Sequence, residues 1–411
     1  MLQKHFLAAL FLFSFTAQAQ SPEITSWIIN TTGATGYNNI PSNVQLVQYS
    51  ANWVYVTCTC IPGYDIGPWV GNPNIPANQN FLFRITRSPQ ENTGALVNTP
   101  LGHIGTWSNG VSIFNAKDAM SYNNQGIWNQ NAIMVEGQSF DTCLGHPAPN
   151  GEYHHHLHPK CLYDENDNTV HSPIIGYAFD GFPIYGAYGY VNTNGTGGIT
   201  RMRTSYRLRN ISARTSLPDG TVLNAGQYGP AISSFYPLGY YIEDYEYVAG
   251  LGDLDEHNGR FCVTPDYPSG IYAYFVTIDS LLQGEYPYTV GLQYYGTVPS
   301  GNTGPGSGHN VITEAVTVYT PTYIAADDNP DNFYSAFPNP AANEFAIDNK
   351  NFTINAVELF NTAGEKVYSL STPQNSPVTI SVRDLPSGIY FLRITGAENI
   401  QSAMQRIVVA K

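Results

Sequence analysis

The sequence is poor in charge, and poorest in positive charge. Only 12% of its 411 residues are charged, and 17 Lys and Arg residues stand against 31 acidic ones, which gives a net charge of −14 at pH 7. A nucleic-acid partner requires a basic face, so this balance excludes DNA and RNA from the expected partners. Beyond the first 20 residues there is no run of about 18 apolar residues, so the sequence predicts no transmembrane helix.

Cysteine is scarce too, with five residues in the chain. Cys143 and Cys161 stand at the two ends of a histidine-rich stretch, and a disulfide between them would stabilise the fold by about 3 kcal/mol. The pairing of the other three stays open. Cys58 and Cys60 share one strand face, where a bond between them is awkward, so one of them pairing with Cys262 is the favoured arrangement. Metal binding by Cys58 and Cys60 is the alternative.

Glycine, tyrosine and proline are abundant instead, at 38, 30 and 28 residues, and aromatic side chains make up 13% of the chain. So high an aromatic content argues against a disordered protein. Short apolar and aromatic runs separated by turn residues recur along the chain, and Asn115–Tyr122 could form a short helix. The sequence therefore predicts a mainly β fold, with a large loop-rich β domain followed by a small C-terminal β-sandwich.

Two segments set the expected domain limits. Residues 1–19 combine Lys4, an apolar run from Phe6 to Phe15 and a small-residue site ending at Ala19, which predicts a cleaved signal peptide and hence export. A polar stretch with a proline at 326–332 predicts a linker. We therefore expect a large domain over 20–325 and a sandwich of evenly spaced short strands over 333–411. Export would also allow disulfides to form.

Histidine is concentrated in one stretch, which holds five of the ten histidines between residues 146 and 158. Asn150-Gly151 predicts a hairpin turn, with His146 on the incoming arm and the histidine run on the outgoing arm. In an extended outgoing arm, alternate side chains share a face, which would bring together His154, His156 and His158. Neighbouring members of that row are roughly 6.5–7 Å apart at Cα, so their rings can reach one ion.

Converging neutral imidazoles predict a divalent metal site, with copper or zinc as the expected ion. The predicted ligands are the hairpin histidines and one from a later segment, namely His146, His154, His156, His158 and His257. Glu152 is the nearest candidate for a catalytic base. Asp180 and Asp255 are candidate outer partners that would orient ligating imidazoles. The alternatives are a hydrogen-bonded hairpin that binds nothing and, for Asp180, a plain turn residue.

Three ordered motifs resemble the YHYH domain family over about residues 44 to 297. They are Gly145-His146-Pro147 with Tyr153-His154-His155-His156, then Gly176-Tyr177-Ala178-Phe179-Asp180-Gly181-Phe182-Pro183-Ile184-Tyr185-Gly186, then Leu254-Asp255-Glu256-His257-Asn258-Gly259-Arg260 with Val263-Thr264-Pro265. The resemblance implies a fold and a histidine motif but no reaction. His155 stands where the family has its second Tyr, and it faces away from the proposed ligands. His257 stands where many members carry Cys, and Cys262 where many carry Gly, which would move a disulfide or make His257 an added ligand.

The segment from 333 to 411 resembles the C-terminal sorting domain of the type IX secretion system. The similarity rests on Phe337-Pro338-Asn339-Pro340-Ala341, Phe360-Asn361-Thr362-Ala363-Gly364, Leu385-Pro386-Ser387-Gly388-Ile389-Tyr390 and Val408-Val409-Ala410-Lys411. The resemblance implies the type IX secretion machinery as a partner. It also implies a Gram-negative, Bacteroidota-like source and a mature protein that is secreted or attached to the outer cell surface.

Three functions fit these features. The first is a secreted or surface protein with a histidine-based divalent metal site, such as a metal-dependent enzyme whose substrate the sequence does not name. The second is an extracellular glycan- or protein-binding module without catalysis, in which tryptophans stack on sugar faces; the candidates are Trp53, Trp69, Trp107 and Trp128. The third is a structural surface protein whose histidines only pack.

Overall fold

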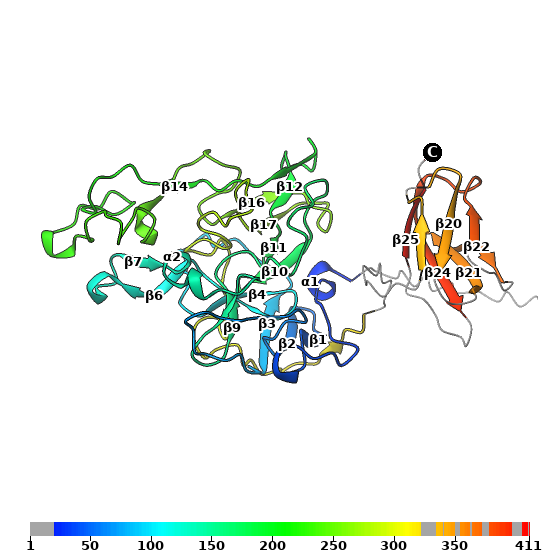
Figure 1. The fold of residues 1–411 in the computed structure, drawn as a ribbon, viewed down its shortest axis with the longest axis horizontal. Helices are drawn as coiled ribbons and strands as arrows, with labels where there is room; N and C mark the ends of the chain where they lie inside the picture. The colour runs from blue at the N-terminus through cyan, green and yellow to red at the C-terminus, as the bar shows by residue number, and fades with distance from the viewer. Residues whose placement is uncertain are drawn as a thin grey trace, which may run out of the picture. The chain divides into compact units, whose positions relative to one another are not determined.

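The computed structural model describes residues 20–321 and, in the C-terminal part, residues 334–339, 341–349, 354–361, 364–371, 378–396, 405–409 and 411. The chain divides into two compact units, one ending at Thr320 and the other starting at Pro321. Both units are mainly β, as the sequence predicts (Figure 1). The predicted signal peptide over 1–19 and linker over 326–332 lie outside the described residues, so these domain limits stay predictions.

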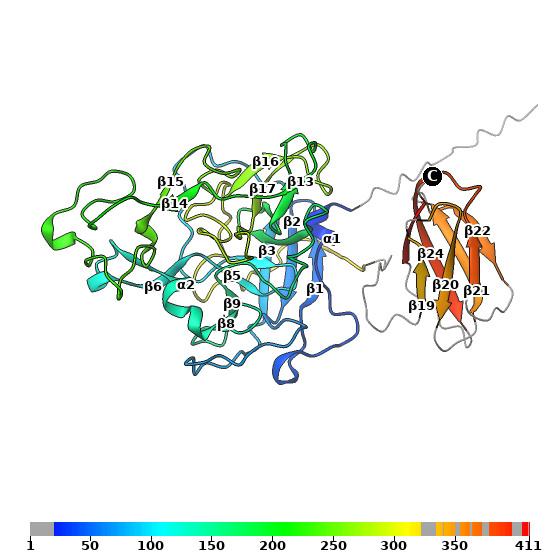
Figure 2. The ribbon, with the colours of Figure 1, turned by 45° about the horizontal axis from the view of Figure 1, so that its top comes forward.

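The first unit contains a four-stranded antiparallel sheet in the order β18-β1-β2-β3, and Figure 2 shows β1, β2 and β3 side by side. Its strands are β1 (Val44–Tyr49), β2 (Trp53–Cys58), β3 (Phe81–Thr86) and β18 (Thr317–Val318). Along β3, Phe81, Phe83 and Ile85 are buried and the residues between them are half-buried. This alternation is expected of a strand with one face on a core.

An eight-stranded sheet in the order β16-β17-β11-β10-β4-β5-β9-β8 carries the histidine hairpin at its edge. Its strands are β4 (His103–Trp107), β5 (Ser112–Phe114), β8 (His146–Pro147), β9 (Tyr153–His155), β10 (Ile174–Ala178), β11 (Pro183–Tyr185), β16 (Gly259–Cys262) and β17 (Ile271–Phe275). The two sheets share one apolar core, in which Val56 and Phe83 belong to the same cluster as Tyr177 and Phe275. A second core, with Trp107 among its members, covers the other face of the eight-stranded sheet.

Short elements extend from these sheets. Three two-stranded ribbons pair β6 (Lys117–Ser121) with β7 (Asn129–Asn131), β12 (Tyr188–Tyr190) with β13 (Ile199–Arg201), and β14 (Tyr206–Leu208) with β15 (Tyr245–Tyr247). The helices are α1 (Pro22–Thr25), α2 (Ala132–Glu136) and the 3₁₀ turns η1 (Tyr37–Asn39), η2 (Tyr122–Asn124), η3 (Gly137–Ser139), η4 (Ala225–Gln227) and η5 (Ile242–Asp244). In the described part of the chain, none of the helices has the length and apolar character needed to cross a bilayer.

The second unit is the predicted small β-sandwich. One sheet has the order β19-β20-β23 and the other β22-β21-β24-β25. Their bounds are β19 (Tyr334–Phe337), β20 (Glu344–Asn349), β21 (Ile354–Asn361), β22 (Lys366–Leu370), β23 (Val378–Ser381), β24 (Gly388–Gly396) and β25 (Gln405–Val409). Phe345 and Ile347 from the first sheet share one core with Leu359 and Leu392 from the second, so the two sheets pack face to face.

Two local predictions are wrong. The predicted helix over residues 115–122 is absent: β6 forms there and pairs with β7, with Lys117 opposite Asn131, and only the 3₁₀ turn η2 begins at Tyr122. The Asn115 side chain accepts a hydrogen bond from the Lys117 backbone N–H, a local bond that competes with a helical turn. The favoured pairing of Cys262 with Cys58 or Cys60 is also wrong, because all three thiols are free and buried in the shared core, where they pack as small apolar side chains.

Candidate metal centre

The histidine hairpin is built on two short strands at the edge of the eight-stranded sheet. β8 and β9 pair antiparallel, and His146 lies directly opposite His154. β9 also pairs parallel with β5, which sets Ser112 opposite His154 and gives β9 a neighbour on each side, while β8 forms the edge of the sheet. Strand pairing alone therefore brings two of the predicted ligands face to face.

The base of the hairpin is clamped twice. The predicted disulfide is present, with Cα atoms of Cys143 and Cys161 5.2 Å apart. The Asp141 carboxylate accepts hydrogen bonds from the backbone N–H groups of Cys143 and Gly145, at 3.0 and 3.1 Å, and from the Tyr153 hydroxyl at 2.9 Å. These bonds fix the backbone next to His146 and His154 without using an imidazole.

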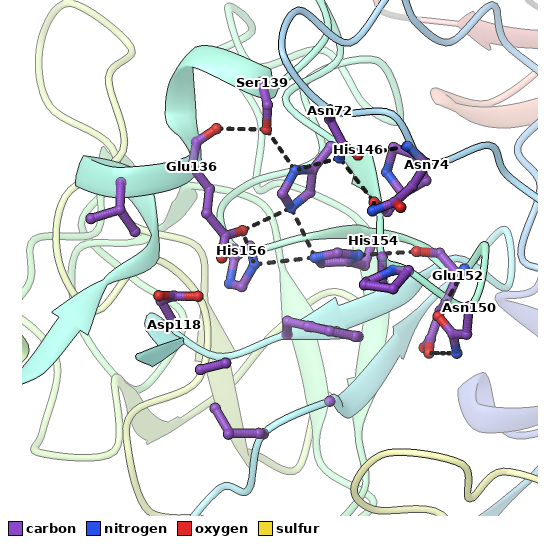
Figure 3. Close-up of a pocket in the computed structure, with 18 of the residues that line it drawn as sticks. Asn72, Asn74, Asp118, Glu136, Ser139, His146, Asn150, Glu152, His154 and His156 are labelled. Atoms are coloured by element: carbon purple, nitrogen blue, oxygen red, sulfur yellow. Dashed lines mark hydrogen bonds and ion pairs between the residues drawn. The ribbon is translucent and has the colours of Figure 1, made fainter. Parts of the chain in front are cut away.

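Three imidazoles and one carboxylate converge in the wall of a pocket (Figure 3). The Nε2 atom of His154 lies 3.1 Å from the Nε2 atoms of both His146 and His156. Glu136, the last residue of α2, places Oε2 2.9 Å from His146 Nε2 and 3.3 Å from His156 Nε2. All four atoms lie within 4.8 Å of one another. The histidines are buried and Glu136 is half-buried. We call these four residues the His₃Glu cluster.

The outward nitrogens of two of these rings face backbone carbonyls. Nδ1 of His154 is 3.1 Å from the carbonyl oxygen of Glu152, and Nδ1 of His156 is 2.6 Å from that of Asn115. A carbonyl can only accept, so both Nδ1 atoms carry the proton. In the neutral rings Nε2 is then a lone-pair atom that points into the cluster.

The third ring is oriented by a serine. Nδ1 of His146 lies 2.8 Å from Ser139 Oγ, and the Ser139 hydroxyl donates its own proton to the Glu136 carbonyl at 2.8 Å. Ser139 Oγ therefore accepts from His146 Nδ1, and His146 Nε2 also presents a lone pair. The Asn72 amide lies farther from Nδ1, at 3.4 Å, and donates mainly to the carbonyl of Pro147 at 2.9 Å.

Three lone pairs and a carboxylate oxygen thus face one point, which is repulsive unless a cation or protons lie among them. Burial, followed by the neighbouring histidines, lowers the pKa of His154 well below its ordinary value. Burial also lowers the pKa of His146. Burial alone would raise the pKa of Glu136. The neighbouring His146 and His156 outweigh burial and bring that pKa below its usual range, because a ring protonated at Nε2 would donate to the carboxylate. Protonation of His146 and His154 is therefore disfavoured, and a metal ion satisfies all four atoms at once.

Aromatic side chains hold the rings in place, and the pocket gives access to them. Phe114 stacks on His154 with ring centroids 3.8 Å apart, and Phe140 meets His146 edge to face at 4.8 Å. The pocket has a volume of about 1080 Å³ and is lined largely by apolar and amide side chains, with Val70, Leu101 and Val135 among them. A small molecule can therefore approach the cluster from the pocket side.

Two predicted ligands lie elsewhere. The chain bends at His156 and Leu157, directly after β9, so His158 leaves the strand alternation and its Nε2 pairs with the Glu165 carboxylate at 2.9 Å, with both side chains buried. Nδ1 of His257 lies 2.9 Å from the carbonyl of Gln293. Neither histidine belongs to the His₃Glu cluster.

The predicted catalytic base is engaged elsewhere. Glu152 lines the pocket, but its Oε1 lies 2.8 Å from Nδ1 of His103, and both side chains are buried. Its backbone carbonyl orients His154 instead.

The two predicted outer partners also bond away from the cluster. Asp180 accepts a hydrogen bond from the Tyr274 hydroxyl at 2.6 Å, and Asp255 accepts one from Tyr272 at 2.9 Å. In the structure, the ligating imidazoles are oriented by two backbone carbonyls and by Ser139. No sequence pattern identifies these groups as acceptors.

Sequence reasoning missed Glu136 and its neighbour Asp118. Glu136 ends a short helix that Asn131 caps by accepting from the Ile133 N–H at 3.1 Å. Asp118, on β6, lies beside Glu136 (Figure 3). Burial, and then the hydrogen bond with Glu136, raises the pKa of Asp118 to about 6. The Asn131 cap could have placed the helix, but no spacing rule links Glu136 to the histidines.

Two family models match the chain. Residues 82–285 match the model of the YHYH protein, and residues 335–410 match that of the secretion system C-terminal sorting domain. No curated protein matches the sequence. One similar solved structure is that of PorZ, an essential bacterial surface component of the type-IX secretion system of Porphyromonas gingivalis. It is 12% identical with a TM-score of 0.17, and the alignment covers 93% of this chain. The chain spans 47% of that PorZ chain, and so low a score carries no argument about fold or function.

Proposed function

We propose that this secreted or outer-surface protein, which carries a YHYH domain over residues 82–285 and a secretion sorting domain over residues 335–410, binds one divalent transition metal ion through Glu136, His146, His154 and His156. The observation that supports the proposal most strongly is the shared orientation of the three imidazoles. Each turns a lone pair toward the same point because its other nitrogen donates to a fixed acceptor.

The spacing of the ligand atoms fits a small ion. In a tetrahedral site with metal–nitrogen bonds of about 2.0–2.1 Å, neighbouring ligand atoms are roughly 3.3–3.4 Å apart. In the cluster four of the six separations are 2.9, 3.1, 3.1 and 3.3 Å, close to this value, and the other two are no longer than 4.8 Å. Imidazole ligands suit zinc and copper, and the carboxylate is compatible with both.

The pocket suggests what such an ion would do. A divalent ion at this position would polarise a bound group and lower the pKa of a bound water toward about 7. Glu136, Asp118 and the pocket amides would surround that group. The catalytic role of Glu152 stays a prediction, and in the structure the Glu152 carboxylate is already engaged by His103.

Metal content tests the proposal. The purified chain is loaded with Zn²⁺ or Cu²⁺, desalted, and measured by elemental mass spectrometry. We expect about one tightly held ion per chain. A His154→Ala, His156→Ala double variant should retain far less, because it removes two of four converging ligands.

A matched control separates the cluster from non-specific histidine binding. His309 is exposed and lies outside the cluster, so His309→Ala should hold as much metal as the wild type. Only trace metal in the loaded wild type, or equal metal in the double variant, would rule the proposal out.

The tryptophans predicted for the metal-free, glycan-binding alternative are not free to stack on a sugar. Trp107 and Trp128 are completely buried. Arg84 covers the Trp53 ring at 4.4 Å, and the Trp69 indole donates to Asp141 at 3.2 Å. These tryptophans pack within the fold and do not support a sugar platform.

A further inference from the structure

A second pocket lies next to the ribbon formed by β14 and β15. It has a volume of about 780 Å³, within the usual size range of small-molecule sites, and shares no lining residue with the pocket of the His₃Glu cluster. Leu217, Pro218, Asp219 and Thr221, from the loop after β14, also line it. Asn98 and Gln293, hydrogen-bonded to each other at 3.0 Å, contribute a further part of the lining.

One side of this pocket is aromatic. Tyr206 and Tyr247 are directly opposite in the ribbon, with ring centroids 5.6 Å apart. Tyr245 lies two residues before Tyr247, hence on the same strand face, and stacks on the buried Tyr286 at 4.1 Å. Tyr286, which also lines the pocket, meets Tyr206 edge to face at 5.2 Å and so packs against both strands of the ribbon. Tyr247 is 36% exposed, so part of its ring is accessible to a ligand.

The polar part of the lining is rich in acceptors and lacks basic groups. Asp219, Glu243 and Glu256 line the pocket, and no Lys or Arg does. The two oxygens of Glu243 are held in place by the Asn129 backbone N–H and side-chain amide, each at 2.7 Å. Carboxyl oxygens of this kind accept hydrogen bonds from a ligand. Burial raises the pKa of Glu243 to about 7, so the repulsion of an anionic ligand rests on Asp219 and Glu256.

The nearest arginines are committed to other partners. Arg207 points to the opposite face of the ribbon and pairs with Glu246 at 2.9 Å. Arg209 donates to the backbone carbonyls of Ser216, Leu217 and Glu243. Neither side chain lines the pocket, so its acceptors have no cationic partner there.

We propose that this pocket binds a saccharide that carries no acidic group, with a sugar ring stacked on Tyr247 and flanked by Tyr206, whose ring is tilted by 57°, and with its hydroxyls donating to Glu243 and Glu256. Aromatic faces match the apolar face of a sugar ring, and the carboxylates match its hydroxyl donors. Amide groups of Asn98, Gln227 and Gln293 supply both donors and acceptors around the rim. The site is independent of the metal.

Direct binding measurements test this site. The purified chain is titrated by calorimetry with neutral cello-, manno- and N-acetylated chito-oligosaccharides, with amine-bearing chitosan oligomers, and with acidic oligogalacturonate. We expect binding to at least one neutral or amine-bearing oligomer and none to oligogalacturonate. Tyr247→Ala should weaken the binding about tenfold, and Glu256→Gln by a smaller factor. Both side chains are exposed, so these variants are expected to fold, which thermal unfolding checks.

Tyr228→Ala is the matched control. Tyr228 is 39% exposed, lies in the segment between β14 and β15, and lines neither pocket. It should bind as the wild type does, and so should the His154→Ala, His156→Ala variant and the wild type in chelator. Four results would overturn the site: no oligosaccharide binds; only oligogalacturonate binds; Tyr247→Ala and Glu256→Gln bind like the wild type; or binding disappears with the metal.

Discussion

Two of the histidine–carboxylate arrangements around the hairpin differ in how many ligand atoms converge and in how open they are to the pocket. At the His₃Glu cluster three Nε2 atoms and one carboxylate oxygen share a point beside an open pocket, and the Glu136 side chain is 24% exposed. At the closed pair one Nε2 of His158 meets one carboxylate oxygen of Glu165 at 2.9 Å, with side chains 1% and 6% exposed. One nitrogen and one oxygen meet in the closed pair, whereas four ligand atoms converge in the His₃Glu cluster, and one proton cannot bridge four acceptors. The number of ligand atoms and their access, more than the number of histidines, distinguish a metal site from a buried pair.

Removing the central ligand should have the largest effect. His154 Nε2 is 3.1 Å from both other imidazole nitrogens, so His154→Ala takes away the atom that the other two share as a neighbour. We expect zinc affinity, measured by competition with a chromophoric chelator, to fall by well over the 10- to 100-fold loss typical of outer partners. An affinity within tenfold of the wild type would place the ion elsewhere.

Breaking the closed pair should cost stability and spare the metal. His158→Ala leaves the Glu165 carboxylate buried without its partner, which is expected to lower the free energy of unfolding by about 3–5 kcal/mol. Urea denaturation measures this loss, and the same variant should bind zinc with unchanged affinity. A variant that loses metal affinity in step with stability would remove the distinction between the two arrangements.

Asp180 extends the comparison to a carboxylate buried without any cation. Burial raises its pKa to about 6, above the ordinary value near 3.9 of the unfolded chain. Its contribution to stability is therefore fully present below about pH 4 and is lost as the pH rises through about 6, by up to about 3 kcal/mol. Urea denaturation between pH 4 and pH 7 should show this loss in the wild type relative to Asp180→Asn. Parallel pH profiles for the two proteins would contradict it.

Removing a residue that orients a ligand, without removing the ligand, should have the smallest effect. Ser139→Ala removes the acceptor that orients His146 but leaves all four ligands in place. Zinc affinity should fall by about tenfold, within the range for outer partners. The disulfide and Asp141 keep the hairpin closed, so the melting temperature of the metal-free protein should change little. No change in affinity would show that Phe140 packing alone orients the ring.

The local part of the site could be predicted from sequence, and the tertiary part could not. Asn150-Gly151 and the alternation of His154 with His156 indicate a hairpin with converging rings, and that hairpin is present. The alternation ends where the chain bends after β9, so His158, a predicted ligand, lies outside the cluster and pairs with Glu165.

Glu136 shows the other limit. It reaches the histidines from a short helix ten residues before His146, and only the packing of α2 over the hairpin brings it there. Strands such as β3 can be predicted from the sequence, because apolar residues alternate along them with a period of two. The tyrosine platform of β14 and β15 depends on a register between segments about forty residues apart, which no local pattern encodes.

X-ray absorption of the zinc-loaded chain tests the central claim most directly. The account predicts a first shell of three imidazole nitrogens and one carboxylate oxygen at about 2.0–2.1 Å, with the multiple scattering that imidazole rings produce. A shell with fewer than two imidazoles, or one that contains sulfur, would contradict it.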